Sequence, residues 1–117
     1  MPSIATKFWR QVLLANALEL TWFAVSFGTL LKDVRPRVTL VGNPYTMEGR
    51  LAARLSRAHR IPSACIEHGS IFANDPIWSD CPIDRVLAWG EPSRRALLSC
   101  GVAAKSVRVV GSPRLDR

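Results

Sequence analysis

Four short apolar runs in this chain each end in a turn that contains glycine. With their turns, the runs are VTLVG-NP (38–44), SACIEHG-S (63–70), RVLAWG-EP (85–92) and VRVVG-SP (107–113). Glycine lets the backbone turn sharply and leaves room for a ligand or a second chain segment to approach. Segments with helical spacing separate the runs, and this alternation indicates βαβ units and a mostly parallel, helix-covered sheet. The chain is therefore expected to fold as an α/β domain.

The elements can be placed from the apolar spacing and the turn residues. We expect strands at 37–41, 63–67, 83–89 and 107–110, and helices at 47–59 and 92–100. Thr46 is the expected N-cap of the first of these helices. Residues 68–82 form a long connection, and a connection of that length within a compact domain is usually either functional or disordered.

Length and charge limit the possible functions. The 117 residues make one domain at most, and Lys and Arg number 16 against nine acids, a net charge of +7. This excess favours anionic partners, namely phosphate groups, nucleotide-linked substrates, acidic membrane surfaces or nucleic acid. Nucleic acid is not expected, because the arginines lack interleaved aromatic residues and no nucleic-acid motif is present.

The segment from Val12 to Leu31 is apolar enough to resemble a membrane anchor. Glu19 lies near its middle, however, and a carboxylate within a membrane span is costly. Apolar residues recur at helical spacing, so one face is expected to pack on the sheet: Leu13, Ala17, Leu20, Ala24, Phe27 and Leu31. We expect a helix at about 8–31 that is packed or interfacial, with a true span or a peripheral membrane helix as the alternatives.

Polar residues follow the apolar runs. In open parallel sheets, ligands bind in the crevice beyond the carboxyl ends of the strands. The residues found at those ends here are Asn43, Glu67, His68, Ser70, Glu91 and Ser112. One edge of the sheet is therefore the expected functional edge.

His68 is the sharpest candidate for chemistry. An imidazole directly after a buried strand can serve as a general base or as a hydrogen-bond donor to phosphate. The plainer alternative is a loop histidine bonded to backbone carbonyls. Glu67 and Glu91 could orient His68 or bind a hydroxyl, or could be ordinary solvated acids. His59 is expected to be a charge at the C-terminus of its helix.

Other motifs argue against several functions. The three cysteines, Cys65, Cys81 and Cys100, have no metal-ligand spacing and are expected to be reduced thiols. The chain contains no GxGxxG, no GxxxxGK[ST] and no GxSxG pattern. Arg50, Arg54 and Arg57 lie on one side of the helix at 47–59, where a solvated face is the expected role.

Taken together, three stretches resemble a known family. They are RAHRIPSACIEHGSI, PIDRVLAWGEPSRRALLSCGV and VRVVGSPRLD. With the arginine–proline turn that precedes the first strand, at Arg35 and Pro36, the match covers about Arg35 to Asp116. The pattern resembles the N-terminal half of GT-B type glycosyltransferases of surface and capsular polysaccharide synthesis. That group shares features with CDP-glycerol glycerophosphotransferases and UDP-N-acetylglucosamine 2-epimerases.

The resemblance implies a fold, a site and partners. The fold would be a Rossmann-like, mostly parallel sheet with helices on both faces, a partial GT-B N-terminal domain with its α/β core at about 35–117. Catalysis would involve His68 and Glu67, and the acceptor-side cleft would be lined by Asn43, Gly69, Ser70, Gly90, Glu91, Gly111, Ser112 and Arg114. The partners would be a glycan or lipid-linked acceptor and a nucleotide-sugar donor, in the cytoplasm or at the inner face of the membrane.

The chain departs from the family at two points. Glu67 stands where the family usually has a glutamine-like residue before the HG pair. The second Rossmann-like domain, which binds most of the donor in this fold, is not in the sequence, so we expect a fragment that binds no cofactor and is inactive alone. The alternatives are a CDP-alcohol phosphotransferase or sugar epimerase on the same scaffold, and a non-catalytic basic binding module.

Overall fold

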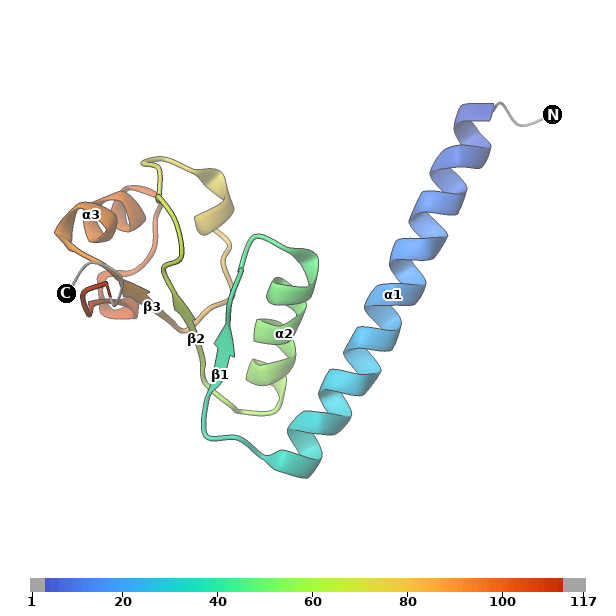
Figure 1. Ribbon diagram of the computed structural model, residues 1–117, viewed down its shortest axis with the longest axis horizontal. Coiled ribbons are helices and arrows are strands. Elements are labelled where there is room, and N and C mark those ends of the chain that lie inside the picture. Colours follow the sequence, from blue (N-terminus) through green and yellow to red (C-terminus); the bar gives the residue numbers. More distant parts are fainter. Residues whose placement is uncertain (1–3, 113–117) are drawn as a thin grey trace.

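The computed structural model describes residues 4–112 and contains the expected alternation of strands and helices (Figure 1). The elements are α1 (Ile4–Val34), β1 (Thr39–Val41), α2 (Met47–Ala58), β2 (Ser63–Ile66), the 3₁₀ turn η1 (Pro76–Trp78), β3 (Arg85–Ala88), α3 (Glu91–Ser99), the 3₁₀ turn η2 (Ala104–Ser106) and β4 (Val107–Val109). Each predicted strand and helix is present, with ends that differ from the prediction by a few residues.

The four strands form one sheet in the order β1-β2-β3-β4, and every neighbouring pair is parallel. Parallel neighbours need crossover connections, which α2 provides between β1 and β2 and α3 provides between β3 and β4. The predicted α/β class, with a Rossmann-like parallel sheet, is confirmed.

One face of the sheet carries the core. Val41, Cys65, Val86 and Val107 are paired in register across the four strands, so their side chains point to the same side. All four are buried in one cluster that also contains Ala52 and Ala53 of α2, Trp78 of η1, Leu97 of α3, and Cys100, the C-cap of α3. Helices α2 and α3 therefore cover the same face.

The opposite face of the sheet is exposed in the part of the chain that the structure describes. Leu40 and Ile66 point to that side and are 62% and 43% exposed. The sequence predicted helices on both faces, whereas the described helices lie on one. The reason is the sequential strand order: successive right-handed crossovers between neighbouring strands put their helices on the same side.

Helix α1 packs on α2 (Figure 1). The sequence predicted that it would pack on the sheet. In its C-terminal half Leu31 is buried, and Phe23 and Phe27 stack with ring centroids 5.4 Å apart and contact the core cluster. Farther towards the N-terminus Leu13 is 66% exposed, because the helix extends past the end of α2. Residues Thr6–Val34 are long and apolar enough to cross a membrane, a property that core helices and signal sequences share.

Candidate functional site

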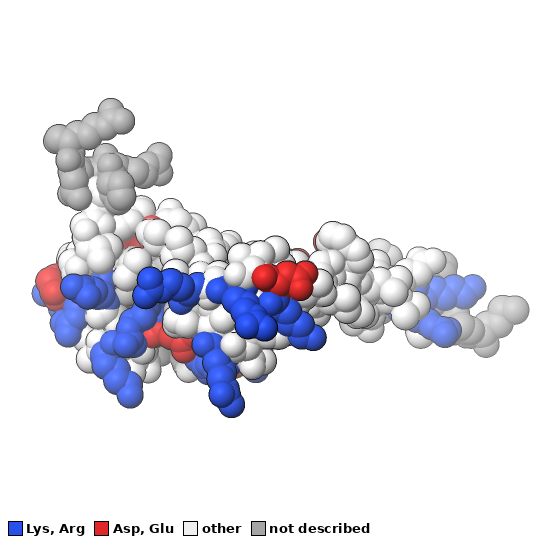
Figure 2. All heavy atoms as spheres, turned by 90° about the horizontal axis from the view of Figure 1, so that it is seen from below, with Lys and Arg blue, Asp and Glu red and all other residues white. Residues whose placement is uncertain are grey.

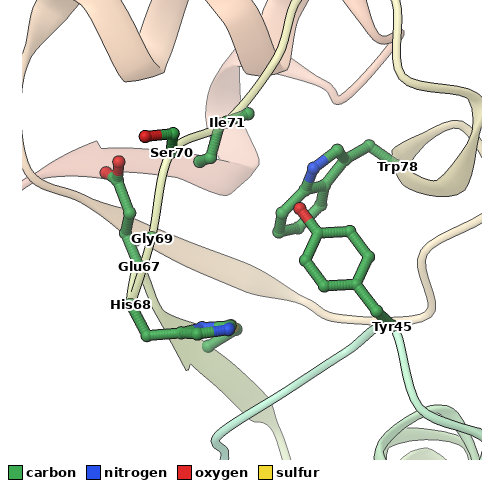
Figure 3. A pocket seen from close by; sticks show the side chains of 8 residues that line it. Tyr45, Glu67, His68, Gly69, Ser70, Ile71 and Trp78 are labelled. Atoms are coloured by element: carbon green, nitrogen blue, oxygen red, sulfur yellow. The ribbon is translucent and has the colours of Figure 1, made fainter.

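A small cavity of about 90 Å³ opens at the carboxyl end of β2 (Figure 3). Its walls come from the end of β2, from the β1–α2 loop and from the connection between β2 and β3. The lining residues are Tyr45, Cys65, Glu67, His68, Gly69, Ser70, Ile71 and Trp78. The cavity lies where ligands bind in open parallel sheets, and four predicted site residues (Glu67, His68, Gly69 and Ser70) are in its wall.

Glu67 is buried and fixes the end of β2 to the next strand. Its Oε2 accepts a hydrogen bond from the backbone N–H of Trp89 (2.6 Å), and its Oε1 accepts one from the hydroxyl of Ser93 (2.6 Å). Figure 3 shows the carboxylate pointing away from the rings of Tyr45 and Trp78. Glu67 thus joins the ends of β2 and β3 and the first turn of α3, which is a positioning role.

His68 is the next residue, and its side chain is exposed. Its ring lies edge-on to Tyr45, with ring centroids 6.4 Å apart. Tyr45 in turn lies edge-on to Trp78 at 5.3 Å. The backbone is anchored through Glu67 while the imidazole stays open to solvent, so His68 is placed to exchange a proton with a group that enters the cavity.

Trp78 and Tyr45 give the cavity its polar contacts on the aromatic side. The indole Nε1 of Trp78 is buried and has no hydrogen-bond partner among the described residues. Burial raises the pKa of the Tyr45 hydroxyl, and the nearby indole N–H partly opposes that rise. The Tyr45 hydroxyl is therefore a polar neighbour of the indole N–H, although the contact between them does not meet the geometric criteria of a hydrogen bond.

Three arginines of α2 hold the connection that carries Trp78. Arg50 and Arg54 contact its middle part, and Arg57 contacts its end. Arg50 donates to the carbonyl oxygens of Ile77 (3.4 Å) and Asp80 (2.6 Å) and to the Asp80 carboxylate (3.0 Å). Arg54 also contacts Asp80, at 3.4 Å.

Arg57 bonds the carbonyl oxygen of Pro82 (2.9 Å) and the carboxylate of Asp84 (3.1 Å). The arginine stripe, predicted to be a solvated face, therefore fastens the β2–β3 connection to α2.

The other predicted site residues follow strand ends but do not line the cavity. Asn43 shapes the β1–α2 loop, where its Oδ1 accepts a hydrogen bond from the backbone N–H of Tyr45 (2.9 Å). Gly90 caps α3, and the exposed Glu91 pairs with Arg94 at 3.4 Å.

Near the end of the described chain, Gly111 has a positive φ of 82°. Ser112 is buried, and its hydroxyl has no hydrogen-bond partner among the described residues. Arg114 lies outside the described residues.

The thiols are placed as packing groups. Cys65, Cys81 and Cys100 are free. Burial raises the pKa of Cys65 to about 12, and it also raises the pKa of Cys81. These two thiols are therefore protonated at neutral pH and are poor nucleophiles. Within residues 4–112 no group of three or more His, Cys, Asp or Glu side chains is arranged to hold a metal ion.

Sequence reasoning missed Tyr45 and Trp78 as parts of the site. Each lies in a connection rather than at a strand end, and only the tertiary fold brings them to His68. The available signal was the length of the 68–82 segment together with its aromatic residues, which marked the segment as functional or disordered without placing a side chain.

No protein-family model matches the chain, and no curated protein matches it. A proposal of function therefore rests on the site together with the sequence resemblance.

Proposed function

We propose that this chain is the acceptor-side domain of a nucleotide-sugar-dependent glycosyltransferase of cell-surface polysaccharide synthesis, working in the cytoplasm. The observation that carries the proposal is the exposed imidazole of His68 in the wall of the cavity at the carboxyl end of β2. The parallel sheet supports it, because this edge is where such folds bind ligands. The sequence resemblance over about Arg35 to Asp116 supplies the reaction class.

In the proposed reaction a hydroxyl of the acceptor glycan enters the cavity beside His68. The hydroxyl oxygen forms a bond to the anomeric carbon of the donor sugar, and its proton passes to the imidazole. The bond from that carbon to the nucleotide's phosphate oxygen breaks, and the nucleotide leaves with the bonding electron pair. General-base assistance of this kind contributes roughly 10²–10⁴-fold to a rate.

The size of the cavity supports a role on the acceptor side. Pockets that enclose whole small molecules measure roughly 300–1,000 Å³, whereas this one measures about 90 Å³. One hydroxyl-bearing group fits, but a nucleotide sugar does not. The donor would therefore be bound by a further domain of the complete protein.

The two histidines of the chain provide a matched test of the role proposed for His68. The variants are made in the complete gene product that contains this chain. His68→Gln should lower sugar transfer to a membrane glycan by roughly 10²-fold or more with an unchanged unfolding midpoint. His59→Gln should leave transfer unchanged, because His59 caps the C-terminus of α2 at the opposite edge of the sheet. Equal transfer by both variants would remove His68 from the mechanism.

A donor screen separates this proposal from the related reactions. A glycosyltransferase consumes a nucleotide sugar only when the acceptor is present, whereas an epimerase converts its substrate without any acceptor. Release of cytidine monophosphate from a CDP-alcohol would instead assign the protein to the phosphotransferases.

A further inference from the structure

Helix α1 carries a second apolar face that nothing in the described structure covers. We define the outer stripe as Leu14, Leu18, Trp22 and Val25, which recur at i, i+4, i+8 and i+11. Their exposed fractions are 56%, 71%, 73% and 65%. A helix that is apolar on two sides needs a partner on each, because exposed apolar surface of this kind is unfavourable in water.

The outer stripe faces away from the globular part of the molecule. Phe27, on the side that packs towards α2, lies nine residues from Leu18, which is about 180° around the helix at 3.6 residues per turn. In Figure 1 α2 lies along one side of α1. Because Phe27 packs on that side, the helical spacing puts the stripe on the side away from α2. The occupant must therefore approach from outside the domain.

Cationic residues bound this stripe at both ends. Lys7 lies seven residues before Leu14 and Lys32 lies seven residues after Val25, which places both on the same side of the helix as the stripe. Arg10, Arg35 and Arg37 lie close by in sequence. None of these five cations forms an ion pair within residues 4–112.

Figure 2 shows how charge is distributed along one face of the molecule. Lys and Arg side chains gather over the globular part, a smaller group lies near the projecting end of α1, and the helix between them is almost free of charge. We propose that α1 lies flat in the surface of an anionic bilayer, with the outer stripe at the boundary between head groups and acyl chains and the cations on the lipid phosphates. An apolar stripe containing Trp and Leu with flanking Lys and Arg is the composition of helices that lie in this interface.

The packing of α1 opposes a full span. Residues 6–19, which precede the contact with α2, extend only about 21 Å at 1.5 Å per residue, whereas the hydrocarbon layer is about 30 Å thick. From Leu20 onward α2 lies alongside, and it brings Arg50 and Arg54 to the groove that contains Leu20. A span would have to bury those arginines in lipid, which is costly.

Partition onto vesicles tests the inference with a matched pair of variants. Leu18→Glu and Leu30→Glu make the same change at exposed positions of one helix, but Leu30 lies about 120° away from Leu18 and off the stripe. In flotation with vesicles of phosphatidylcholine and phosphatidylglycerol, Leu18→Glu should weaken binding by roughly 10- to 100-fold, the effect of losing one buried leucine. Leu30→Glu should change it by no more than about fivefold, since one added surface charge costs of order 1 kcal/mol at most.

The contribution of the lysine charges to binding and the depth of Trp22 in the bilayer are tested separately. Lys7→Gln and Lys32→Gln should each weaken binding about fivefold on these vesicles, the equivalent of ~1 kcal/mol per lysine, and should have no effect on pure phosphatidylcholine. Brominated lipid should quench the fluorescence of Trp22 when the bromine is near the head group, and a Trp22→Phe variant should lose that signal.

Three results would overturn the inference. They are equal loss of binding in the two glutamate variants, quenching of Trp22 only by bromine at the bilayer centre, and a lipid-free dimer that Leu18→Glu dissociates. The last would assign the stripe to a second copy of the chain. The inference does not rest on the proposed function, since partition requires no substrate.

Discussion

At the scale of single residues, Glu67 lines the cavity wall, yet its side chain holds the surrounding elements together. Its two carboxylate oxygens are both used, on Trp89 and Ser93, while its backbone presents His68. Sequence alone marked Glu67 as a catalytic candidate, because an acid beside a histidine at a strand end has the right chemistry. The direction of the side chain depends on β3 and α3, which lie more than twenty residues away in sequence.

Substituting Glu67 tests this positioning role. Glu67→Gln places an amide NH₂ against one of two donors, so a buried bond is lost and the free energy of unfolding should fall by about 1–3 kcal/mol. Glu91→Gln makes the same change at an exposed residue paired only with Arg94. The free energy of unfolding of this variant should differ from that of the parent protein by no more than about 0.5 kcal/mol. Urea unfolding measures both, and equal stabilities would contradict the role assigned to Glu67.

Asp84 makes stability depend on pH. Burial alone would raise its pKa, but hydrogen bonds from the N–H and hydroxyl of Ser63 (both 2.9 Å), together with the Arg57 guanidinium, lower the pKa below 3.8. A depressed folded-state pKa contributes stability that is fully present above the unfolded value and is lost as the pH falls through the folded value.

The Asp84→Asn variant isolates this contribution. The parent protein should be more stable than the variant at pH 7, and the difference should shrink as the pH falls below about 4, the range set by the ordinary aspartate pKa. Unfolding midpoints measured across that range check it. A difference that stayed constant down to pH 2 would show that the carboxylate charge is not what stabilises this contact.

At the scale of elements, the start of α2 depends on one glycine. A Cβ on Gly49 would run into the backbone carbonyl of Asn43, while the Gly49 N–H bonds the Thr46 hydroxyl at 3.1 Å. Thr46 was predicted from sequence as the cap and is confirmed. The close approach of the β1–α2 loop was not visible from sequence, because spacing does not show how tightly two segments pack.

Two glycine-to-alanine substitutions separate the effect of helix propensity on stability from the effect of close packing around the glycine. Gly28, within α1, has open space around its Cβ position, so Gly28→Ala should stabilise the protein by up to about 1 kcal/mol. Gly49→Ala gains the same propensity but must displace backbone, and should destabilise by about 1–3 kcal/mol. Thermal unfolding compares the two, and a stabilised Gly49→Ala variant would contradict the packing described at this turn.

At the scale of the whole molecule, the sequence predicted the fold class correctly, but it did not predict which face of the sheet the helices cover. Strands such as Ser63–Ile66 and the crossover helices follow from local spacing, and parallel pairing follows from their alternation. Which face the helices cover depends on strand order. Sequence periodicity does not encode strand order, so the exposed side of the sheet at Leu40 and Ile66 was not foreseen.

The same limit applies to the site and to the charged surface. His68 and its neighbours were predicted because chain order alone brings strand ends to one edge. Tyr45 and Trp78 required the loops to be placed in space. The arginines of α2 were predicted to be solvated because their acidic partners, Asp80 and Asp84, lie about 25 to 30 residues away and leave no local signal.

The measurement that tests the central claim most directly is a nuclear magnetic resonance titration of the chain with a panel of mono- and disaccharides. The Trp78 indole N–H, assigned with a Trp78→Phe variant, and the His68 ring signals should shift together as a sugar hydroxyl enters the cavity. The indole signals of Trp9 and Trp22, far along α1, should stay in place. Sugar-dependent shifts confined to other residues, or none across the panel, would contradict an acceptor site at the carboxyl end of β2.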